Sequence, residues 1–555
     1  MKNNKTPISI ITVVVLLILV NVVSSKVYQR FDLTKDNRYT LSKASKSLVS
    51  NLDSPLIIDV FLEGDFPSEF RLLQTEVKQI IDEFQLETNQ IFINYINPIE
   101  DETTRERNIE ELTKSGLEPY ISTNNSSGKV TKEIIFPWAF ANYKDETVKI
   151  PLLKRSITQG LQQQINTSVQ ALEYGFADGF SKLLSPKAKK IAILKGNGEL
   201  DDLYMADFLK TMQPYYNIAP FTLDSVATNP QGTLDNLKQY DLIIAAKPSD
   251  PFSENEKLVL DQYTMYGGKS LWLTEAVIMD KDSLYNDAGT GVSIMRDLKL
   301  NDFFFKYGIR INPSLVKDLY SAPIMLAIGE GSQAQLQALQ WQYSPLAASN
   351  PNHPITKNLD LVKYDFASPI DTLKNDIDKS ILLQSSPQSK LEGAPATISL
   401  RNITEAPDES TFKLGPQNLA VLLEGEFTSV YDKRILPFKV KGFKAKSAST
   451  KMVVISDGDV IKNDVVRNRP QELGFDQLTG KAFGNKEFLL NTINYLLDDT
   501  GLINIRSKEI SIAFLDLEKI KNQKSKWQLI NIALPLLLLG LFGFTFNYFR
   551  RKKYT

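Results

Sequence analysis

The chain contains no cysteine and a single histidine, His353, among its 555 residues. Without cysteine it cannot form a disulfide, a thiolate metal site or a cysteine nucleophile. A serine–histidine–aspartate triad would depend on His353 alone. That histidine lies in Asn352-His353-Pro354, a sequence typical of a loop, and no Gly-x-Ser-x-Gly elbow surrounds any serine. We therefore expect a structural role for His353.

The chain also has no large excess of either charge: it contains 64 basic and 65 acidic residues, which gives a net charge of −1. Nucleic-acid-binding chains usually carry a basic excess, so no nucleic-acid partner is expected. The sequence Gly196-Asn197-Gly198-Glu199 lacks the third glycine of a dinucleotide fingerprint, and no Gly-Lys-Ser/Thr follows it as in a P-loop. We expect no cofactor and no resident metal.

No apolar run between the two ends of the chain is long enough to cross a bilayer. The apolar runs lie at the ends, at residues 8–23 and 529–546. A membrane helix needs about 20 mostly apolar residues. The second run reaches that length with Trp527 and Tyr548 as its interfacial ends. The sequence predicts a large body tied to one membrane by two helices.

The charges beside these runs predict the orientation. Short flanks rich in lysine and arginine stay in the cytoplasm. The first run follows Lys2 and Lys5, and Arg550 and Arg551 follow the second. We expect both termini inside and the body in the periplasm of a bacterial inner membrane. The alternative is a cleaved signal peptide, with small residues at 22–24, although the apolar run is long for one.

The first block of the body alternates strands and helices. Apolar runs predict strands at 56–62 and 91–96, and helical periodicity predicts helices at 68–87 and 103–114. A hairpin is expected to pair 132–143 with 147–150. This order matches a thioredoxin-like fold. Its redox dithiol would lie at Phe66-Pro67-Ser68, where the chain has no cysteine, so only the shape is expected. A long helix at 155–184 should connect this block to the next, with a membrane-lying or partner-binding helix as the alternative.

From residue 187 the pattern changes to continuous apolar runs at 191–194, 242–246, 270–273 and 452–455. Runs without alternation favour a parallel sheet covered on both faces. A helix should begin at Ser253, where Ser253 and Glu256 form a capping box, and end at Gly267-Gly268. A long insertion, 275–450, should hold strands at 381–384 and 419–423 and loops at 321–333 and 385–396. A last helix is expected at 486–497.

Ligands of open α/β sheets bind beyond the carboxyl ends of the strands. The candidate crevice there consists of Gly196, Asn197, Gly198, Glu199, Glu275, Asp457 and Asp459. Its four carboxylates could hold a metal or act as acid and base. The alternative, which we favour, is that such residues serve only the turns.

The C-terminal run is not uniformly apolar. Asn531 is costly in lipid and usually faces protein. Pro535, Gly540 and Gly543 accompany it, and glycine permits close helix approach. These four residues are the candidate contact with a permease helix. The alternative is that glycine and proline are simply common in membrane helices.

Several motifs together resemble one family. They are Asp32-Leu33-Thr34, Tyr39-Thr40-Leu41-Ser42, Gly196-Asn197-Gly198-Glu199, Phe252-Ser253-Glu254, Gly267-Gly268-Lys269 and Trp527-Gln528-Leu529-Ile530-Asn531. The family is that of the auxiliary subunits of ABC-type transport systems, and the chain is most similar to its gliding-motility-associated members. The resemblance implies a core similar to class I glutamine amidotransferases and work beside an ABC permease and its ATPase. Relatives often carry histidine where this chain has Asn197.

These observations predict an α/β chain in which a thioredoxin-like domain precedes an amidotransferase-like, flavodoxin-like domain. The expected segments are 1–25 (anchor), 26–154, 155–186 (connector), 187–505, 506–527 (juxtamembrane) and 528–555 (anchor and basic tail). The predicted function is that of a non-catalytic auxiliary subunit of an ABC-type complex in gliding motility. The alternatives are a solute- or glycan-binding protein and a carboxylate-dependent hydrolase.

Overall fold

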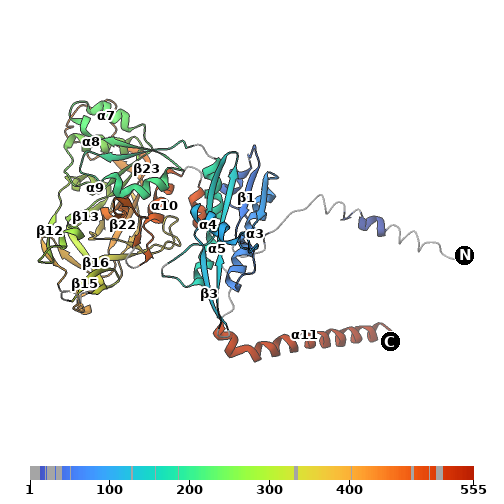
Figure 1. Ribbon diagram of the computed structural model, residues 1–555. Helices are drawn as coiled ribbons and strands as arrows, with labels where there is room; N and C mark the ends of the chain where they lie inside the picture. The colour runs from blue at the N-terminus through green and yellow to red at the C-terminus, as the bar shows by residue number, and fades with distance from the viewer. Residues whose placement is uncertain are drawn as a thin grey trace. The chain divides into compact units, whose positions relative to one another are not determined.

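The structure is a computed structural model. It describes residues 13–18, 20–21, 32, 40–50, 52–126, 129–156, 158–184, 187–329, 335–401, 403–476, 480–498, 501–507 and 517–554. The chain divides into a large unit that ends at Lys508 and a small one that begins at Glu509. Parallel and antiparallel strands alternate with helices in the large unit (Figure 1), so the α/β class is confirmed as a mixed one.

The first part of the large unit is built on a four-stranded sheet of order β2-β1-β5-β6. Its strands are β1 (Leu56–Val60), β2 (Ile91–Tyr95), β5 (Trp138–Tyr143) and β6 (Glu146–Pro151). Strand β1 runs parallel to β2 and antiparallel to β5. Helix α3 (Ser68–Glu87) has the predicted bounds, and α4 (Arg105–Lys114) begins two residues later than predicted.

The predicted hairpin strand 132–143 is in fact two strands, which corrects the sequence reading. Strand β4 (Lys129–Ile135) pairs with β3 (Tyr120–Ser126), whereas β5 pairs with β6. The break falls at Pro137, which has no N–H to give to a continuous ladder.

Helix α5 (Leu161–Leu184) lies against the sheet and against α3. Its Phe180 ring meets the Phe84 ring of α3 at 5.1 Å. Gly179 allows the close approach to β6, since a Cβ there would lie 2.7 Å from the Ile150 side chain. The helix begins six residues after the predicted start. Before it, the Arg155 guanidinium binds the Glu118 carboxylate and the Pro119 carbonyl.

The second part is a ten-stranded sheet whose main path is β15-β16-β19-β22-β23-β10-β9-β7-β8. Five neighbouring strands are parallel: β7 (Lys190–Lys195), β8 (Asn217–Thr222), β9 (Leu242–Ala246), β10 (Lys269–Leu273) and β23 (Lys446–Ile455). Four of these were predicted. The sequence reading missed β8, an edge strand that contains Pro220, a residue that edge strands tolerate.

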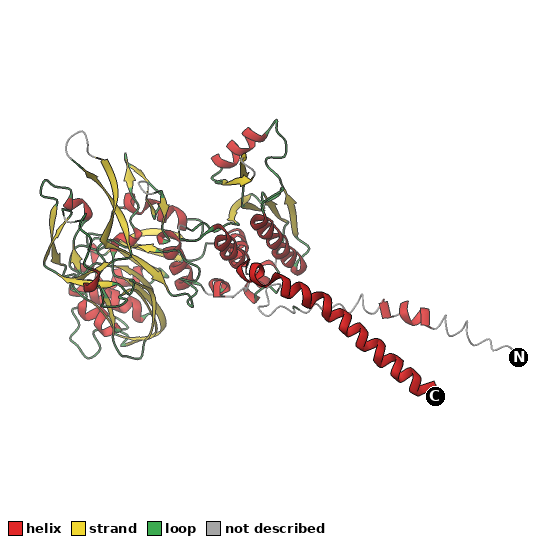
Figure 2. Ribbon diagram, turned by 90° about the horizontal axis from the view of Figure 1, so that it is seen from below, coloured by secondary structure: helices red, strands yellow, loops and turns green. Residues whose placement is uncertain are grey.

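Helices cover both faces of this sheet, as the continuous apolar strands predict. One face carries α6 (Ala206–Met212) and α10 (Asn485–Leu497), and the other carries α7 (Pro230–Leu237), α8 (Glu254–Met265) and α9 (Asn301–Tyr307). The predicted capping box of Ser253 and Glu256 is present at the start of α8. Figure 2 shows the helices on the two sides of the strands.

The antiparallel strands come from the insertion. They are β15 (Ser321–Ile328), β16 (Gln335–Ser349), β19 (Asp378–Gln384), β22 (Asn418–Thr428) and the short β17 (Val362–Lys363), which pairs with β16. Two predicted loops were wrong: 321–333 contains β15, and 385–396 contains β20 (Ser389–Gly393), which pairs with β14 (Ser314–Asp318). Their glycine, serine and proline content favours loops locally, whereas partner strands elsewhere in the chain make them extended.

Smaller strand pairs complete the insertion. Strand β12 (Thr290–Met295) lies between β11 (Val277–Ile278) and β21 (Ala396–Ser399). The short strand β13 (Ile309–Ile311) pairs with β18 (Ile370–Thr372).

The small unit contains one long helix, α11 (Leu517–Tyr554). Its segment Gln523–Lys552 is long and apolar enough to cross a membrane, as predicted for 529–546. The described parts of the other predicted span, 13–18 and 20–21, are helical, and the rest of 8–23 lies outside the described residues.

Candidate functional site

Four parallel strands bring polar residues to one edge of the large sheet. Asn197 follows β7, Lys247 follows β9, Glu275 follows β10 and Asp457 follows β23. Because these strands are parallel and adjacent, their carboxyl ends meet at the same edge. The predicted location of the crevice agrees with this arrangement.

A lysine occupies the centre of the acidic group there. The carboxylates of Glu275, Asp457 and Asp459 lie within 4.8 Å of one another, as in a metal site. The Lys247 ammonium lies 3.1 Å from Glu275 Oε1 and 2.7 Å from Asp459 Oδ1. It also lies 3.0 Å from Asp280 Oδ1. The chain therefore supplies its own cation to carboxylates that could otherwise bind a metal.

Sequence reasoning did not assign this role to Lys247, nor any role to Asp280 or Arg296. The Arg296 guanidinium lies 3.3 Å from Glu275 and supplies a second positive charge. The available signal was a lysine placed directly after a wholly apolar strand. Lys247 also has a φ of 53°, which non-glycine residues rarely adopt.

The cluster retains protons near neutral pH. Burial raises the pKa of Glu275 to about 7, against the opposing effects of Lys247 and Arg296. Burial and the neighbouring carboxylates Asp459 and Glu275 raise the pKa of Asp457 well above its ordinary value. Burial alone would lower the pKa of Lys247, but the surrounding carboxylates raise it instead. The lysine thus stays charged, while burial favours the protonated forms of Glu275 and Asp457.

Asp457 connects two loops. One of its oxygens accepts the Asp459 N–H at 2.7 Å and the other accepts the Asp365 N–H at 2.6 Å. The Asp365 carboxylate in turn lies 3.0 Å from the Lys281 ammonium. Both oxygens of the Asp457 carboxylate therefore accept hydrogen bonds from backbone N–H groups of the chain, as expected for a buried carboxylate with a structural role.

The Gly196–Glu199 turn lies against the loop after β9. The Asn197 carbonyl accepts the N–H groups of Ser249 and Asp250, each at 3.0 Å. A Cβ on Gly198 would lie 2.0 Å from Ser249 Oγ, so this position requires glycine. Gly196 has a φ of 114°, which also favours glycine. The two glycines therefore serve the turn.

Glu199 does not join the carboxylate cluster. One of its oxygens accepts the Asn197 N–H at 2.8 Å, and burial raises its pKa. The other oxygen and Asn197 Oδ1 are buried and have no hydrogen-bond partner within the described residues. The structure thus brings together three of the four predicted carboxylates and separates the fourth.

A pocket of about 600 Å³ opens beside the cluster. Its lining includes Tyr204, Lys281, Lys363, Asp459, Lys462 and Phe483. Its charged groups are largely paired with one another: Lys462 lies 3.8 Å from Asp459, and Lys281 binds Asp365. The pocket is large enough for a small solute.

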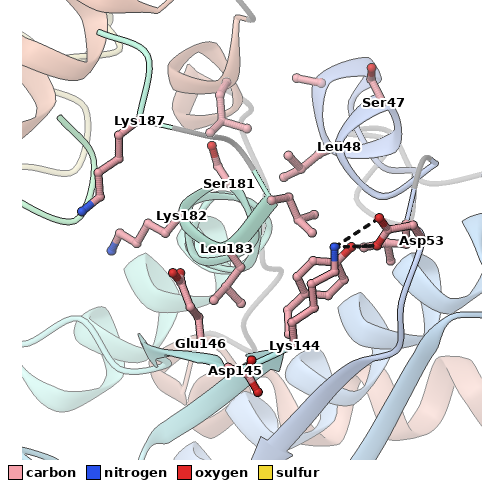
Figure 3. A pocket seen from close by; sticks show the side chains of 15 residues that line it. Ser47, Leu48, Asp53, Lys144, Asp145, Glu146, Ser181, Lys182, Leu183 and Lys187 are labelled. Carbon is pink, nitrogen blue, oxygen red and sulfur yellow. Dashed lines mark hydrogen bonds and ion pairs between the residues drawn. The ribbon is translucent and has the colours of Figure 1, made fainter. Parts of the chain in front are cut away.

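A larger groove, of about 1140 Å³, lies in the first part of the unit. Helix α2 (Lys43–Val49), the β5–β6 turn and the end of α5 line it. Figure 3 shows Leu48 and Leu183 between the Lys144–Asp53 ion pair on one side and Lys182 on the other. The lining contains three acidic and three basic side chains, so the charge of the groove favours neither anionic nor cationic ligands.

His353 has the structural surroundings that its sequence predicts. Its Nδ1 accepts the Ile355 N–H at 3.2 Å, and its ring packs on that of Tyr495 at 5.0 Å. Burial lowers its pKa.

The four candidate permease contacts lie on the apolar segment of α11. A helix turns about 100° per residue, so Asn531 and Gly540, nine residues apart, point to roughly opposite sides. Pro535 lies near the side of Asn531, and Gly543 near that of Gly540. The four residues therefore do not form a single face.

Comparisons with known proteins relate the chain to one family. Residues 188–492 match the auxiliary family described as "ABC-type uncharacterized transport system", and residues 35–142 match a domain of unknown function. An uncharacterized protein of Borreliella burgdorferi is 20% identical over 516 residues, which cover 92% of this chain and 90% of that protein.

Among solved structures, an "mmIFT52 N-terminal domain" is similar over 56% of this chain and 99% of its own, with 14% identity and a TM-score of 0.31. That score is too low to support any statement about the fold. The match to the transport family covers more than half of the residues. The chain belongs to the auxiliary family of ABC-type transport systems.

Proposed function

We propose that the chain is a non-catalytic auxiliary subunit of an ABC-type complex, anchored in the bacterial inner membrane with its body in the periplasm. The observation that carries the proposal is the Lys247 ammonium, which occupies the acidic cluster where a metal or a catalytic carboxylate pair would work. The transport family and the apolar helix α11 support it. The partners are an ABC permease and, through it, a cytoplasmic ATPase.

The domain plan belongs to the same proposal. Residues 26–154 form a thioredoxin-like recognition domain, and 187–505 form an amidotransferase-like domain that uses its insertion for assembly. The β2-β1-β5-β6 order and the five parallel strands favour this division. The anchors are 1–25 and 528–555.

The narrower role, in gliding motility, is a hypothesis that depends on the resemblance to the Bacteroidetes protein GldG. The motifs quoted above carry that resemblance. A deletion strain that still glides would contradict this narrower role and leave the transport role intact.

Affinity purification of the full chain from its native membranes tests the main proposal. We expect a permease and an ATPase of one ABC system to co-purify. Replacing residues 529–546 by polyleucine should preserve membrane insertion, because hydrophobicity alone drives it, and should release the permease if α11 makes the contact. Absence of both subunits from the wild-type purification would contradict the proposed function, whereas their retention by the polyleucine variant would place the contact in the body.

Solute binding is the second candidate function, and the 600 Å³ pocket beside Asp459 favours it. A ligand that binds only the folded state raises the melting temperature by mass action. We expect such a solute to raise the melting temperature of the full chain, and Lys363→Ala, which alters the pocket lining, to reduce the rise. If no compound of a broad solute panel does so, this candidate is excluded. The third candidate, a hydrolase, has no such support, because Glu199 lies apart from the other carboxylates.

A further inference from the structure

A strongly basic surface lies at the opposite end of the large sheet from the acidic cluster. The connection between β22 and β23 carries it. Because β22 is antiparallel to β23, and β23 is parallel to β10, this connection lies at the amino ends of the parallel strands. From Asp432 to Lys451, across the connection and the first residues of β23, the chain contains seven basic residues and one acidic residue.

Several of these charges have no counter-ion. The side chains of Lys433, Lys439 and Lys446 are exposed, and none of them forms an ion pair with any residue that the structure describes. Lys444 shares the Tyr266 ring with Lys238, their ammonium groups lying 4.3 and 4.4 Å from its centroid. Lys238 is paired with Asp235 at 2.7 Å, whereas Lys444 forms no ion pair with any described residue and therefore favours an anionic partner.

The connection is nevertheless held rigidly. The fully buried Asp261 of α8 accepts the Ser429 hydroxyl at 2.6 Å and the Val430 N–H at 2.8 Å. The Gln262 side chain exchanges two hydrogen bonds with the backbone of Lys444, at 2.8 and 2.9 Å. The basic surface is thus pre-organised, which reduces the ordering cost of binding.

Two exposed apolar side chains lie within this basic surface. Ile435 is 95% exposed and Phe305 of α9 is 60% exposed. They flank one ion pair, because Arg434 lies 3.2 Å from Asp302, and Phe305 follows Asp302 by three residues on the same side of α9.

Beside Phe305 lies a groove of about 520 Å³, in which three lysines outnumber two carboxylates beside the apolar side chains of Leu373 and Ile377. The charged residues are Lys306, Lys374 and Lys446, with Asp376 and Glu426. Figure 1 places α7, α8 and α9 on one flank of the sheet.

We propose that this surface, formed by Phe305, Ile435 and the lysines of the β22–β23 connection, docks an acidic segment of a partner protein. Apolar anchors surrounded by a charged rim are typical of protein interfaces, where the anchors supply affinity and the rim supplies steering. A polysaccharide would leave Ile435 and Phe305 unused. A bilayer surface would not fill a concave groove sized for side chains.

A photo-crosslinking residue in place of Ile435, in the full chain expressed in its own cells, tests the proposal. We expect an adduct with one protein, through a peptide rich in aspartate and glutamate. Lys439→Glu with Lys446→Glu should reduce the adduct at least tenfold, because two favourable charge pairs become repulsive. Reversing the charges of the crosslinked peptide should restore it.

The matched control is Lys43→Glu with Lys210→Glu, which reverses two exposed lysines elsewhere and should leave the adduct unchanged. Equal melting temperatures of the two double variants separate loss of docking from loss of folding. If the first variant unfolds, Phe305→Ser replaces it, and the same loss of adduct is expected. No adduct, an adduct insensitive to these changes, or an adduct with lipid or polysaccharide would overturn the proposal.

Discussion

Replacing Lys247 by methionine should destabilise the large unit by about 3–5 kcal/mol, the usual effect of removing one partner from a buried ionic cluster. The lysine side chain is 10% exposed, and those of Glu275 and Asp459 are 6% and 12% exposed. Because these three side chains are largely buried, water compensates poorly for the lost ammonium. Thermal and urea unfolding of the purified full chain measures the effect.

Two controls identify the cause of this loss. Lys210→Met removes an exposed lysine and should change stability by less than about 0.5 kcal/mol. Combining Lys247→Met with Glu275→Gln should cost less than the sum of the single changes, because the second change removes a charge that the first leaves unpaired. Additive losses would contradict the ionic account.

Removing the lysine side chain should also create a cation site. With Lys247→Ala, the three carboxylates within 4.8 Å of one another lose the ammonium that occupies them. Calcium prefers such oxygen ligands, so millimolar calcium should raise the melting temperature of this variant and leave that of the wild type unchanged. A rise in the wild type as well would show that Lys247 does not block the site.

The wild-type cluster should also make stability depend on pH. The pKa of Glu275 rises from its ordinary value of 4.5 to about 7 on folding. Between these values the folded state binds more protons than the unfolded state, so stability should fall as pH rises from about 4.5 to 7. Glu275→Gln should remove this part of the dependence. Melting temperatures measured across that interval test it.

The parts of the fold that could be predicted are those that local sequence determines. The run Leu242–Ala246 is apolar throughout, and only a strand covered on both faces accommodates it. Helix α8 carries its own start signal in Ser253 and Glu256. The loops 321–333 and 385–396 could not be read in this way, because β15 and β20 are extended only by their partner strands.

The candidate site shows the same limit. The sequence places Glu275 and Asp457 shortly after predicted strands, and the pairing of β10 with β23 in the sheet brings the two side chains together. That Lys247 lies between them depends on its backbone conformation and on Asp280, which the insertion contributes. Such an assembly across separate segments leaves no local pattern. The separation of Glu199 likewise depends on a hydrogen bond within its own turn.

A second, partly buried ionic group contains Arg506, which lies in the segment before α11. The Glu487 carboxylate of α10 binds the Lys154 ammonium at 2.6 Å and the Arg506 guanidinium at 2.9 Å. Lys154 also donates to the Asn358 carbonyl, and Arg506 lies 5.1 Å from the centre of the Tyr174 ring of α5. Lys154 lies between β6 and α5, and Arg506 lies eleven residues before α11 begins. The three residues therefore link three segments of the large unit: the one between β6 and α5, helix α10, and residues 501–507.

Glu487→Gln should destabilise the large unit by about 2 kcal/mol or more, below the full value for a buried pair because the Glu487 side chain is 32% exposed. The loss should affect all three segments together, because a neutral amide at this position would leave both cations without their counter-ion. Hydrogen exchange of the full chain should accelerate together at residues 152–156, 354–358 and 501–507. Glu472→Gln, which breaks the exposed pair with Lys486, is the matched control and should have little effect.

The pH dependence gives this last prediction a second measurement. Lys154 and Arg506 overcome the effect of burial and lower the pKa of Glu487 to about 2 from 4.5. A depressed carboxylate pKa stabilises the fold above the unfolded value and ceases to do so as pH falls toward the folded value. The wild type should therefore lose this contribution between about pH 4.5 and 2, and Glu487→Gln should not. Faster exchange confined to 501–507 would show that Arg506 merely closes a local turn and does not couple the three segments.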